Sequence, residues 1–143
     1  MWTRQLSVTS ELIGKKEVWE LITDIDRWHE WDFNIEHSKC IETKVRELSV
    51  FVVKHRNFLK TKGLVEEFIP YERFTFRIRL AGAKLYRKYL LEATKEGLKI
   101  TIITSVSGFL AGLWNLVVVK RIVSDTPEDL NIIVEHIKNR NEK

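Results

Sequence analysis

At 143 residues the chain has the length of one domain, in which roughly two thirds of the unfolded surface can be buried. Its five Trp, seven Phe and three Tyr argue against a disordered chain, and six Gly and two Pro are too few for a repeat array or a long linker. The net charge is only +4, and the basic residues alternate with acidic ones along the chain. This pattern argues against a nucleic-acid partner, because nucleic-acid-binding proteins gather basic residues on one face.

The first part of the chain predicts a strand followed by two short helices. Residues 3–13 alternate between apolar and polar side chains, as in a half-buried strand. Residues 14–24 change to helical spacing, with an apolar stripe at Val18, Trp19, Leu21 and Ile22. A second short helix is predicted over residues 26–31, with Asp26 suited to cap its N-terminus.

Six further strands are predicted in close succession, separated by short breaks of the kind that join antiparallel hairpins. The run 73–80 is the clearest, because its apolar residues alternate strictly with polar and basic ones. The predicted strands are residues 36–43, 47–55, 59–69, 73–80, 85–94 and 98–107.

The stretch between Lys99 and Lys120 carries no charge and is long enough to cross a bilayer as a helix. Residues 98–107 alternate, however, and Ser107-Gly108 punctuates the pattern before helical spacing begins. We therefore predict a strand, a break and a helical segment over 109–140, and no integral membrane span. Pro127 predicts a kink or break of that segment near Asp125 to Pro127.

The stretch "EVWELITDIDRWHEWD" resembles the signature of the START-like (SRPBCC) superfamily, in particular its polyketide cyclase/dehydrase branch. The matching positions are Val18, Trp19, Asp24, Trp28 and Trp31. Residues 65–76 resemble the family's strand, proline, strand junction, and residues 89–102 resemble its penultimate hairpin. Pro127 departs from the family pattern, because it falls in what is usually an unbroken helix.

The resemblance implies an α+β helix-grip fold and a single START-like domain over residues 1–143. In this fold a curved seven-stranded antiparallel β-sheet is wrapped around a long C-terminal α-helix, with two short helices between strands 1 and 2. A curved sheet and one helix leave a cavity wherever large side chains do not fill the space between them. Such cavities are mostly apolar, with a few polar anchors.

The acidic and aromatic stretch 23–32 is interpreted mainly as a structural joint. Trp28 and Trp31 lie three residues apart, so that they share one face of a short helix and can close one end of the sheet. Direct contact of these indoles with a ligand is the less favoured alternative. The neighbouring carboxylates are expected to face water or to cap helix ends.

Arg87 is the polar residue expected to enter the cavity, because it lies in register with Leu85, Tyr89 and Leu91. A buried arginine needs an ion-pair partner or an anionic group, so an internal salt bridge to Glu67 or a solvent-facing position at the sheet edge is the alternative. Tyr89 is a second candidate anchor. The predicted ligand-binding residues are Phe74, Phe76, Arg87, Tyr89, Leu91, Ile102, Leu113 and Trp114.

Neither a metal nor a cofactor is predicted. The four histidines lack metal-binding spacing, and Cys40 has no second cysteine with which to form a disulfide or a metal site. His55 could turn inward, because it follows Phe51 and Val53 in alternation. The N-terminus lacks the apolar stretch of a signal peptide, so we expect a cytoplasmic protein.

Three functions remain open from the sequence. The first is binding of a small hydrophobic molecule (a lipid, isoprenoid, polyketide or aromatic metabolite) between the sheet and the C-terminal helix. The second is a polyketide cyclase, dehydratase or isomerase, in which Arg87, Tyr89 or His55 moves protons. The third is a protein-interaction module with a vestigial pocket, which an exposed apolar patch around residues 109–114 would favour. The sequence decides neither the ligand nor the oligomeric state.

Overall fold

The structure is a computed structural model that describes residues 2–11, 13–32, 34–56, 58–117 and 135. A strand and two short helices come first: β1 (Trp2–Ser10), α1 (Lys15–Thr23) and the 3₁₀-helix η1 (Ile25–Glu30). Six strands and a helix follow: β2 (Ile35–Cys40), β3 (Val50–His55), β4 (Lys60–Ile69), β5 (Arg73–Leu80), β6 (Ala83–Thr94), β7 (Gly97–Ser107) and α2 (Ala111–Val117).

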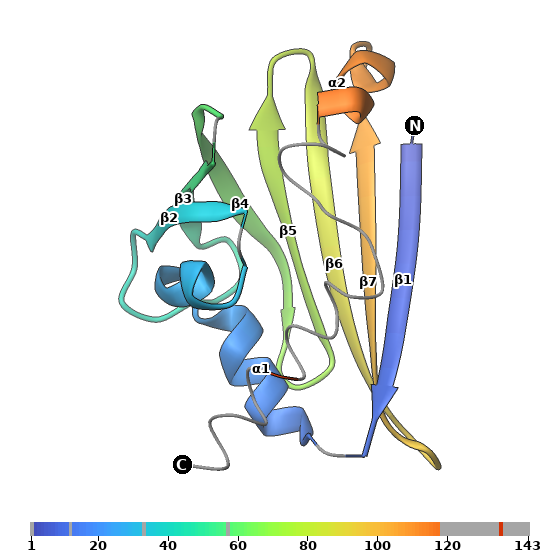
Figure 1. The fold of residues 1–143 in the computed structure, drawn as a ribbon. Helices are drawn as coiled ribbons and strands as arrows, with labels where there is room; N and C mark the ends of the chain where they lie inside the picture. Colours follow the sequence, from blue (N-terminus) through green and yellow to red (C-terminus); the bar gives the residue numbers. More distant parts are fainter. Residues whose placement is uncertain (1, 12, 33, 57, 118–134, 136–143) are drawn as a thin grey trace.

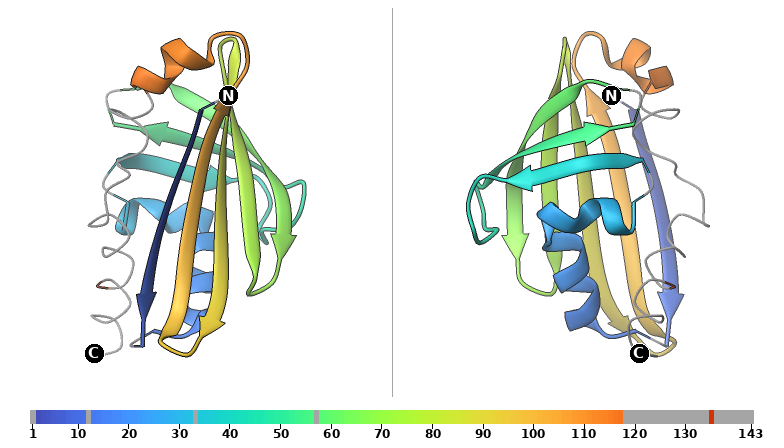
Figure 2. Two further views of the ribbon diagram at one scale, coloured as in Figure 1. Left: turned by 90° about the vertical axis from the view of Figure 1, so that its right-hand side faces the viewer. Right: turned by 60° about the vertical axis from the view of Figure 1, so that its left-hand side comes forward.

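The seven strands form one antiparallel sheet in the order β1-β7-β6-β5-β4-β3-β2. The sheet is strongly curved, and β2 and β3 run across the direction of β7 (Figure 2). A bulge in β4, at the register shift between Val65 and Glu67, interrupts the pairing with β5. Such bulges bend and twist the strand that carries them. The predicted curved sheet of seven antiparallel strands is therefore confirmed.

The ends of three strands differ from the predicted ranges 3–13, 36–43 and 47–55. β1 stops at Ser10, β2 stops at Cys40, and β3 starts only at Val50. Leu48 takes a left-handed backbone conformation (φ 71°), and its N–H donates to the carbonyl of Val65 at 2.8 Å. The chain turns there before it enters the ladder. Alternation in the sequence does not reveal such a turn, because Leu48 is not a residue that favours a positive φ.

The side chains of α1 and η1 complete the core on the concave face of the sheet (Figure 1). Val18 and Ile22 of α1 are fully buried, as the predicted stripe requires. Trp28 of η1 packs between Phe51 and Phe76, with ring centroids 5.3 and 5.0 Å away. Burial of large aromatic side chains contributes much of the stability of such a core.

The capping role predicted for Asp26 is wrong. Asp24 holds the N-cap position of η1, and its side chain makes no capping hydrogen bond there. Asp26 lies in the first turn, and its Oδ1 accepts a hydrogen bond of 2.7 Å from the backbone N–H of Cys40. The carboxylate therefore joins η1 to β2. The prediction failed because the carboxylate of Asp26 accepts its hydrogen bond from the backbone of β2 and not from a backbone N–H of its own helix.

The uncharged stretch after Lys99 is divided as predicted, with β7 first and α2 after the break. Leu98, Ile100, Ile102, Thr104 and Val106, which form one side of β7, are all buried. No helix within the described part of the chain is long and apolar enough to span a membrane. Residues 118–134 and 136–143 lie outside the described residues, and with them the remainder of the predicted C-terminal helix and the break near Pro127.

Gly108 is the break between β7 and α2. Its φ is +116°, and an added Cβ would lie 2.6 Å from the carbonyl oxygen of Gly82. Only glycine fits this conformation and this close approach. Gly112 of α2 differs, because a Cβ added there would meet nothing within 4 Å among the described residues.

Candidate functional site

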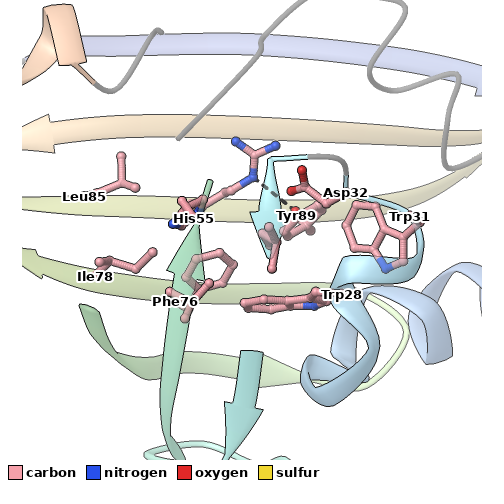
Figure 3. A pocket seen from close by; sticks show the side chains of 11 residues that line it. Trp28, Trp31, Asp32, His55, Phe76, Ile78, Leu85 and Tyr89 are labelled. Carbon is pink, nitrogen blue, oxygen red and sulfur yellow. Dashed lines mark hydrogen bonds between the residues drawn. The ribbon is translucent and has the colours of Figure 1, made fainter. Parts of the chain in front are cut away.

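A pocket lies on the concave side of the sheet, between η1 with the turn that follows it and strands β3, β5 and β6 (Figure 3). Its free central space is about 20 Å³, and all non-atom space within its lining is about 370 Å³. A space of the smaller size holds about one water molecule. The lining residues are Trp28, Trp31, Asp32, Ile35, Val53, His55, Phe76, Ile78, Leu85, Arg87 and Tyr89.

Aromatic rings form one wall of the pocket. The ring of Phe76 lies 5.0 Å from that of Trp28 and 6.4 Å from that of Tyr89, measured between centroids. The indole N–H of Trp28 donates to the carbonyl of Ile22 at 2.8 Å, which fixes the orientation of this ring. Alternation along β5 and β6 places Phe76 and Tyr89 on the buried face, where planar apolar groups can pack against them.

Arg87 enters the pocket from β6. Its Nε donates to the hydroxyl of Tyr89 at 3.1 Å, and its Nη1 donates to Oγ1 of Thr104 at 3.1 Å. The guanidinium carbon also lies 5.6 Å from the centroid of the Tyr89 ring. Arg87 is therefore held by neighbours on β6 and β7, and the inward orientation expected from its register is confirmed.

The alternative of a salt bridge between Arg87 and Glu67 is wrong. Glu67 lies 3.6 Å from Arg73 and 3.8 Å from Lys88, measured between side-chain nitrogen and oxygen atoms. The bulge in β4 leaves Glu67 opposite Thr75, whose hydroxyl lies 3.2 Å from its Oε1. This ion-pair group is therefore distinct from the Arg87 group.

His55 ends β3 inside the pocket. Its side chain is only 4% exposed, and its Nδ1 has no hydrogen-bond partner within the described residues. Burial, and to a lesser degree the positive charges of Arg87 and Lys54, lower the pKa of His55 from its ordinary value to about 4. The imidazole is therefore neutral at neutral pH.

Trp31 and Asp32 form the end of the pocket that follows η1. Nε1 of Trp31 is buried and, like Nδ1 of His55, has no hydrogen-bond partner in the part of the chain that the structure describes. Asp32 is half-buried, and its Oδ1 accepts a hydrogen bond of 3.0 Å from the backbone N–H of Asn34. The pocket thus combines an apolar wall with four titratable side chains, those of Asp32, His55, Arg87 and Tyr89.

Three of the eight residues predicted to bind a ligand lie together in the pocket lining, namely Phe76, Arg87 and Tyr89. Three others, Phe74, Leu91 and Ile102, are buried on the same face of the sheet but outside the lining. Their alternation pattern places them on the correct face, but it does not determine how far along the strand a cavity extends.

The two residues predicted from the helical segment lie elsewhere. Leu113 is 63% exposed, and Trp114 is half-buried. The indole N–H of Trp114 donates to the carbonyl of Ala81, and its ring lies 5.8 Å from that of Phe58. Neither residue belongs to the lining of this pocket. Phe109, which is 88% exposed, is a second exposed apolar side chain of the segment in which the interaction-module alternative expects an apolar patch.

The inward position that the sequence left open for His55 is observed, and the sequence did not single out the other lining residues as the favoured ligand contacts. Ile78 and Leu85 carried a usable signal, because they share the buried face with Phe76 and Arg87. Trp28 and Trp31 were expected to close the core; they do so, and they also form part of the pocket wall. Asp32 carried no signal, because its position depends on the turn that follows η1.

No metal site emerges among the described residues, since they contain no group of three or more His, Cys, Asp or Glu side chains that could hold an ion. Another groove, which is open to solvent, lies at the β5–β6 hairpin and the break before α2. It is lined by Arg79, Leu80, Gly82, Ala83, Lys84, Tyr86, Ser107, Gly108 and Phe109.

Solved structures share this fold, although no family model matches the chain and a comparison with curated proteins finds no match. The di-domain ARO/CYC StfQ from the steffimycin biosynthetic pathway has a TM-score of 0.75 at 11% identity, over 99% of this chain and 52% of that one. Ara h 8.0201 has a TM-score of 0.70 at 14% identity, over 95% and 97% of the two chains. A hypothetical protein from Helicobacter pylori has a TM-score of 0.71 at 15% identity, over 96% and 86%.

Identities this low establish the fold alone. The chain therefore shares its fold with these solved structures. The chain spans about half of StfQ, as a single unit of a di-domain protein would.

Proposed function

We propose that the protein binds a small hydrophobic molecule in the pocket between η1 and strands β3, β5 and β6. The observation that supports this most is the pocket itself, with its aromatic wall and its few polar groups on the concave face of the sheet. Ligand sites in proteins have this composition. Lipids, isoprenoids, polyketides and aromatic metabolites all belong to the chemical class that such a wall accommodates.

A ligand larger than water requires the lining side chains to move apart, because the free central space is only about 20 Å³. Drug-sized ligands occupy pockets of about 300–1,000 Å³. The free central space is far below this range, so ligand binding requires the pocket to widen.

Titration with N-phenyl-1-naphthylamine, an uncharged probe that fluoresces in apolar surroundings, tests this proposal. We expect saturable binding at one site per chain. Leu85→Phe places extra volume in the small free space and should weaken binding at least tenfold, because overpacked sites exclude further atoms. Lys84→Phe is the matched control, because Lys84 is the exposed neighbour of Leu85 on the opposite face of β6.

Binding that is unsaturable, or that is equal in the parent protein and in Leu85→Phe, would refute the proposal. Lys84→Phe should bind the probe as the parent protein does. Native mass spectrometry of gently purified protein then identifies the class of any natural ligand from the mass that accompanies the chain.

A cyclase or dehydratase is the second candidate function. The observation that favours it is the presence of Asp32, His55, Arg87 and Tyr89 in one pocket, because acid-base catalysis requires titratable groups that converge on the substrate. The hydroxyl of Tyr89, already bonded to Arg87, would deliver or accept the proton. A co-purified molecule whose mass falls by one water during incubation with the protein would favour this function over simple binding.

A further inference from the structure

Two buried polar atoms of the pocket lack hydrogen-bond partners within the described residues. They are Nε1 of Trp31 and Nδ1 of His55, whose side chains are 9% and 4% exposed. Native proteins rarely leave such atoms unpaired, because they lose water on folding without gaining a replacement. Both residues line the pocket, so the missing partner can come from a molecule that enters it.

Other polar groups of the lining are already satisfied by the protein. The indole N–H of Trp28 donates to the carbonyl of Ile22, and two donors of Arg87 are used by Tyr89 and Thr104. Figure 3 shows His55 and Trp31 on opposite sides of Tyr89. Both unpaired atoms belong to residues that line the same pocket.

The chemistry of the two atoms restricts what they can bind. An indole N–H only donates, so that its partner must be an acceptor such as a hydroxyl or carbonyl oxygen. The neutral imidazole of His55 carries one donor and one acceptor nitrogen, and it pairs with a hydroxyl in either tautomer.

The charges of the lining do not favour an anion. Arg87 supplies a positive charge, and Asp32 adds an acidic side chain to the same lining. A ligand carboxylate would enter beside the carboxylate of Asp32, and like charges at close range repel each other. An uncharged oxygen meets no such penalty.

We propose that Trp31 and His55 form a polar subsite that selects uncharged hydrophobic ligands bearing a hydroxyl or carbonyl oxygen over hydrocarbons and over carboxylates. This inference rests on the proposed function, because the subsite lies in the same pocket. It adds a rule of specificity: the aromatic wall accepts the body of the ligand, and the subsite selects its oxygen.

Three probes that share one ring system test the rule. We would measure the dissociation constants of naphthalene, 2-naphthol and 2-naphthoate for the full chain by equilibrium dialysis. We expect 2-naphthol to bind about tenfold more tightly than naphthalene, because a hydrogen bond to a buried unpaired group contributes that much. 2-Naphthoate should bind more weakly than 2-naphthol.

Variants assign the preference to the two side chains. Because 2-naphthol has a single hydroxyl, at least one of Trp31→Phe and His55→Leu should reduce the ratio of naphthalene to 2-naphthol dissociation constants at least threefold. Trp28→Phe is the matched control: it also replaces an indole of the lining, but its N–H is already paired with Ile22. This control should weaken both probes equally and keep their ratio, so that general loss of packing is separated from loss of the subsite.

If Trp31→Phe or His55→Leu fails to fold, NMR of the parent protein gives the answer. Both compounds should shift signals of the pocket through their ring currents, but 2-naphthol should shift the indole N–H signal of Trp31 or the ring signals of His55 further than naphthalene does. Signals of both residues that respond alike to the two compounds would contradict the subsite.

The outcomes separate the two proposals. Equal affinity for naphthalene and 2-naphthol, as expected if water alone occupies the subsite, overturns the subsite and leaves the binding function intact. Tighter binding of 2-naphthoate than of 2-naphthol also overturns it, in favour of an anion site. If N-phenyl-1-naphthylamine binds and none of the three compounds does, the subsite again fails alone. If no probe binds, the proposed function fails, and the subsite fails with it.

Discussion

His55 illustrates how one side chain can serve a site and weaken the fold under acidic conditions. In the folded protein burial lowers its pKa to about 4, whereas the unfolded chain has the ordinary value of 6.5. Below pH 6.5 the unfolded chain therefore binds a proton that the folded protein does not, and unfolding becomes easier as the pH falls. The effect stops growing once the pH falls below about 4, where the folded form also takes up the proton.

We predict that His55→Gln removes this pH dependence. Between pH 7 and pH 4 the free energy of unfolding of the parent protein should fall by roughly 3 kcal/mol relative to the variant. Urea denaturation of both proteins at several pH values measures this difference, and other titrating groups cancel in the comparison. His29→Gln is a suitable control, because His29 is exposed. A constant difference across the range would contradict the buried neutral imidazole.

The residues of the pocket were predictable where strand alternation governs them. Phe76, Arg87 and Tyr89 were correctly placed on the inner face, because side chains of a strand alternate between two faces whatever the rest of the fold does. Trp31 and Asp32 depend on the path of the chain after η1, which short-range patterns do not encode. The sequence could not reveal the unpaired atoms of Trp31 and His55, because an atom is recognised as unpaired only from the positions of the residues around it, here the described ones.

The pairing of β3 with β4 depends on a glycine. Phe51 lies opposite Gly63 in the ladder, and its fully buried ring covers the position where a Cβ would stand, 2.1 Å from the nearest ring atom. Large residues pack over glycine in this way where a sheet curves and its core is close-packed.

Gly63→Ala should therefore destabilise the protein by about 1–3 kcal/mol, because the ring or the strand must shift. Gly112→Ala is the matched control: the same substitution in α2 meets open space, and there it should leave stability unchanged or raise it by up to about 1 kcal/mol through helix propensity. Urea midpoints of the two variants test the contrast. Equal effects would show that Phe51 does not constrain position 63.

Elements were more predictable than their ends. The seven strands and the two helices between the first and second of them were identified from periodicity and turn residues, which are local signals. The loop before β3 was missed because Leu48 adopts its unusual backbone through a long-range hydrogen bond to Val65. The role of Asp26 was missed for the same reason, since its partner Cys40 belongs to another element.

At the scale of the whole molecule, we expect that a ligand can enter only if the elements around the pocket move apart together. The pocket is bounded by η1, β3, β5 and β6, and its free space is about 20 Å³. A close-packed interior does not admit a larger molecule without rearrangement.

We predict that saturation with N-phenyl-1-naphthylamine changes backbone amide NMR shifts mainly in η1, β3, β5 and β6. Amides in the middle of β1 should change least, because this strand is at the sheet edge and pairs with β7 alone among the described strands. Shift changes concentrated around Arg79, Lys84 and Phe109 would instead place the probe in the open groove at the β5–β6 hairpin.

The overall fold could be predicted from the sequence because few known folds have this order of strands and helices. Among those folds, the resemblance in residues 17–32 favoured the helix-grip fold. The depth of the pocket was not accessible, because it depends on the volumes of side chains from four elements at once. Function depends on the side chains that shape the pocket and not on the fold alone, since one fold serves many chemistries.

The position of β1 has a consequence for biosynthesis. Its nine residues pair only with β7 among the described strands, and β7 begins at Gly97. At a translation rate of about 5–20 residues per second, the nascent strand leaves the ribosome roughly 5–20 seconds before its partner exists. Throughout this interval its backbone donors and acceptors are open to strands of other nascent chains. Crowded polysomes, or codons that slow translation between residues 11 and 96, should therefore increase aggregation of the newly made protein.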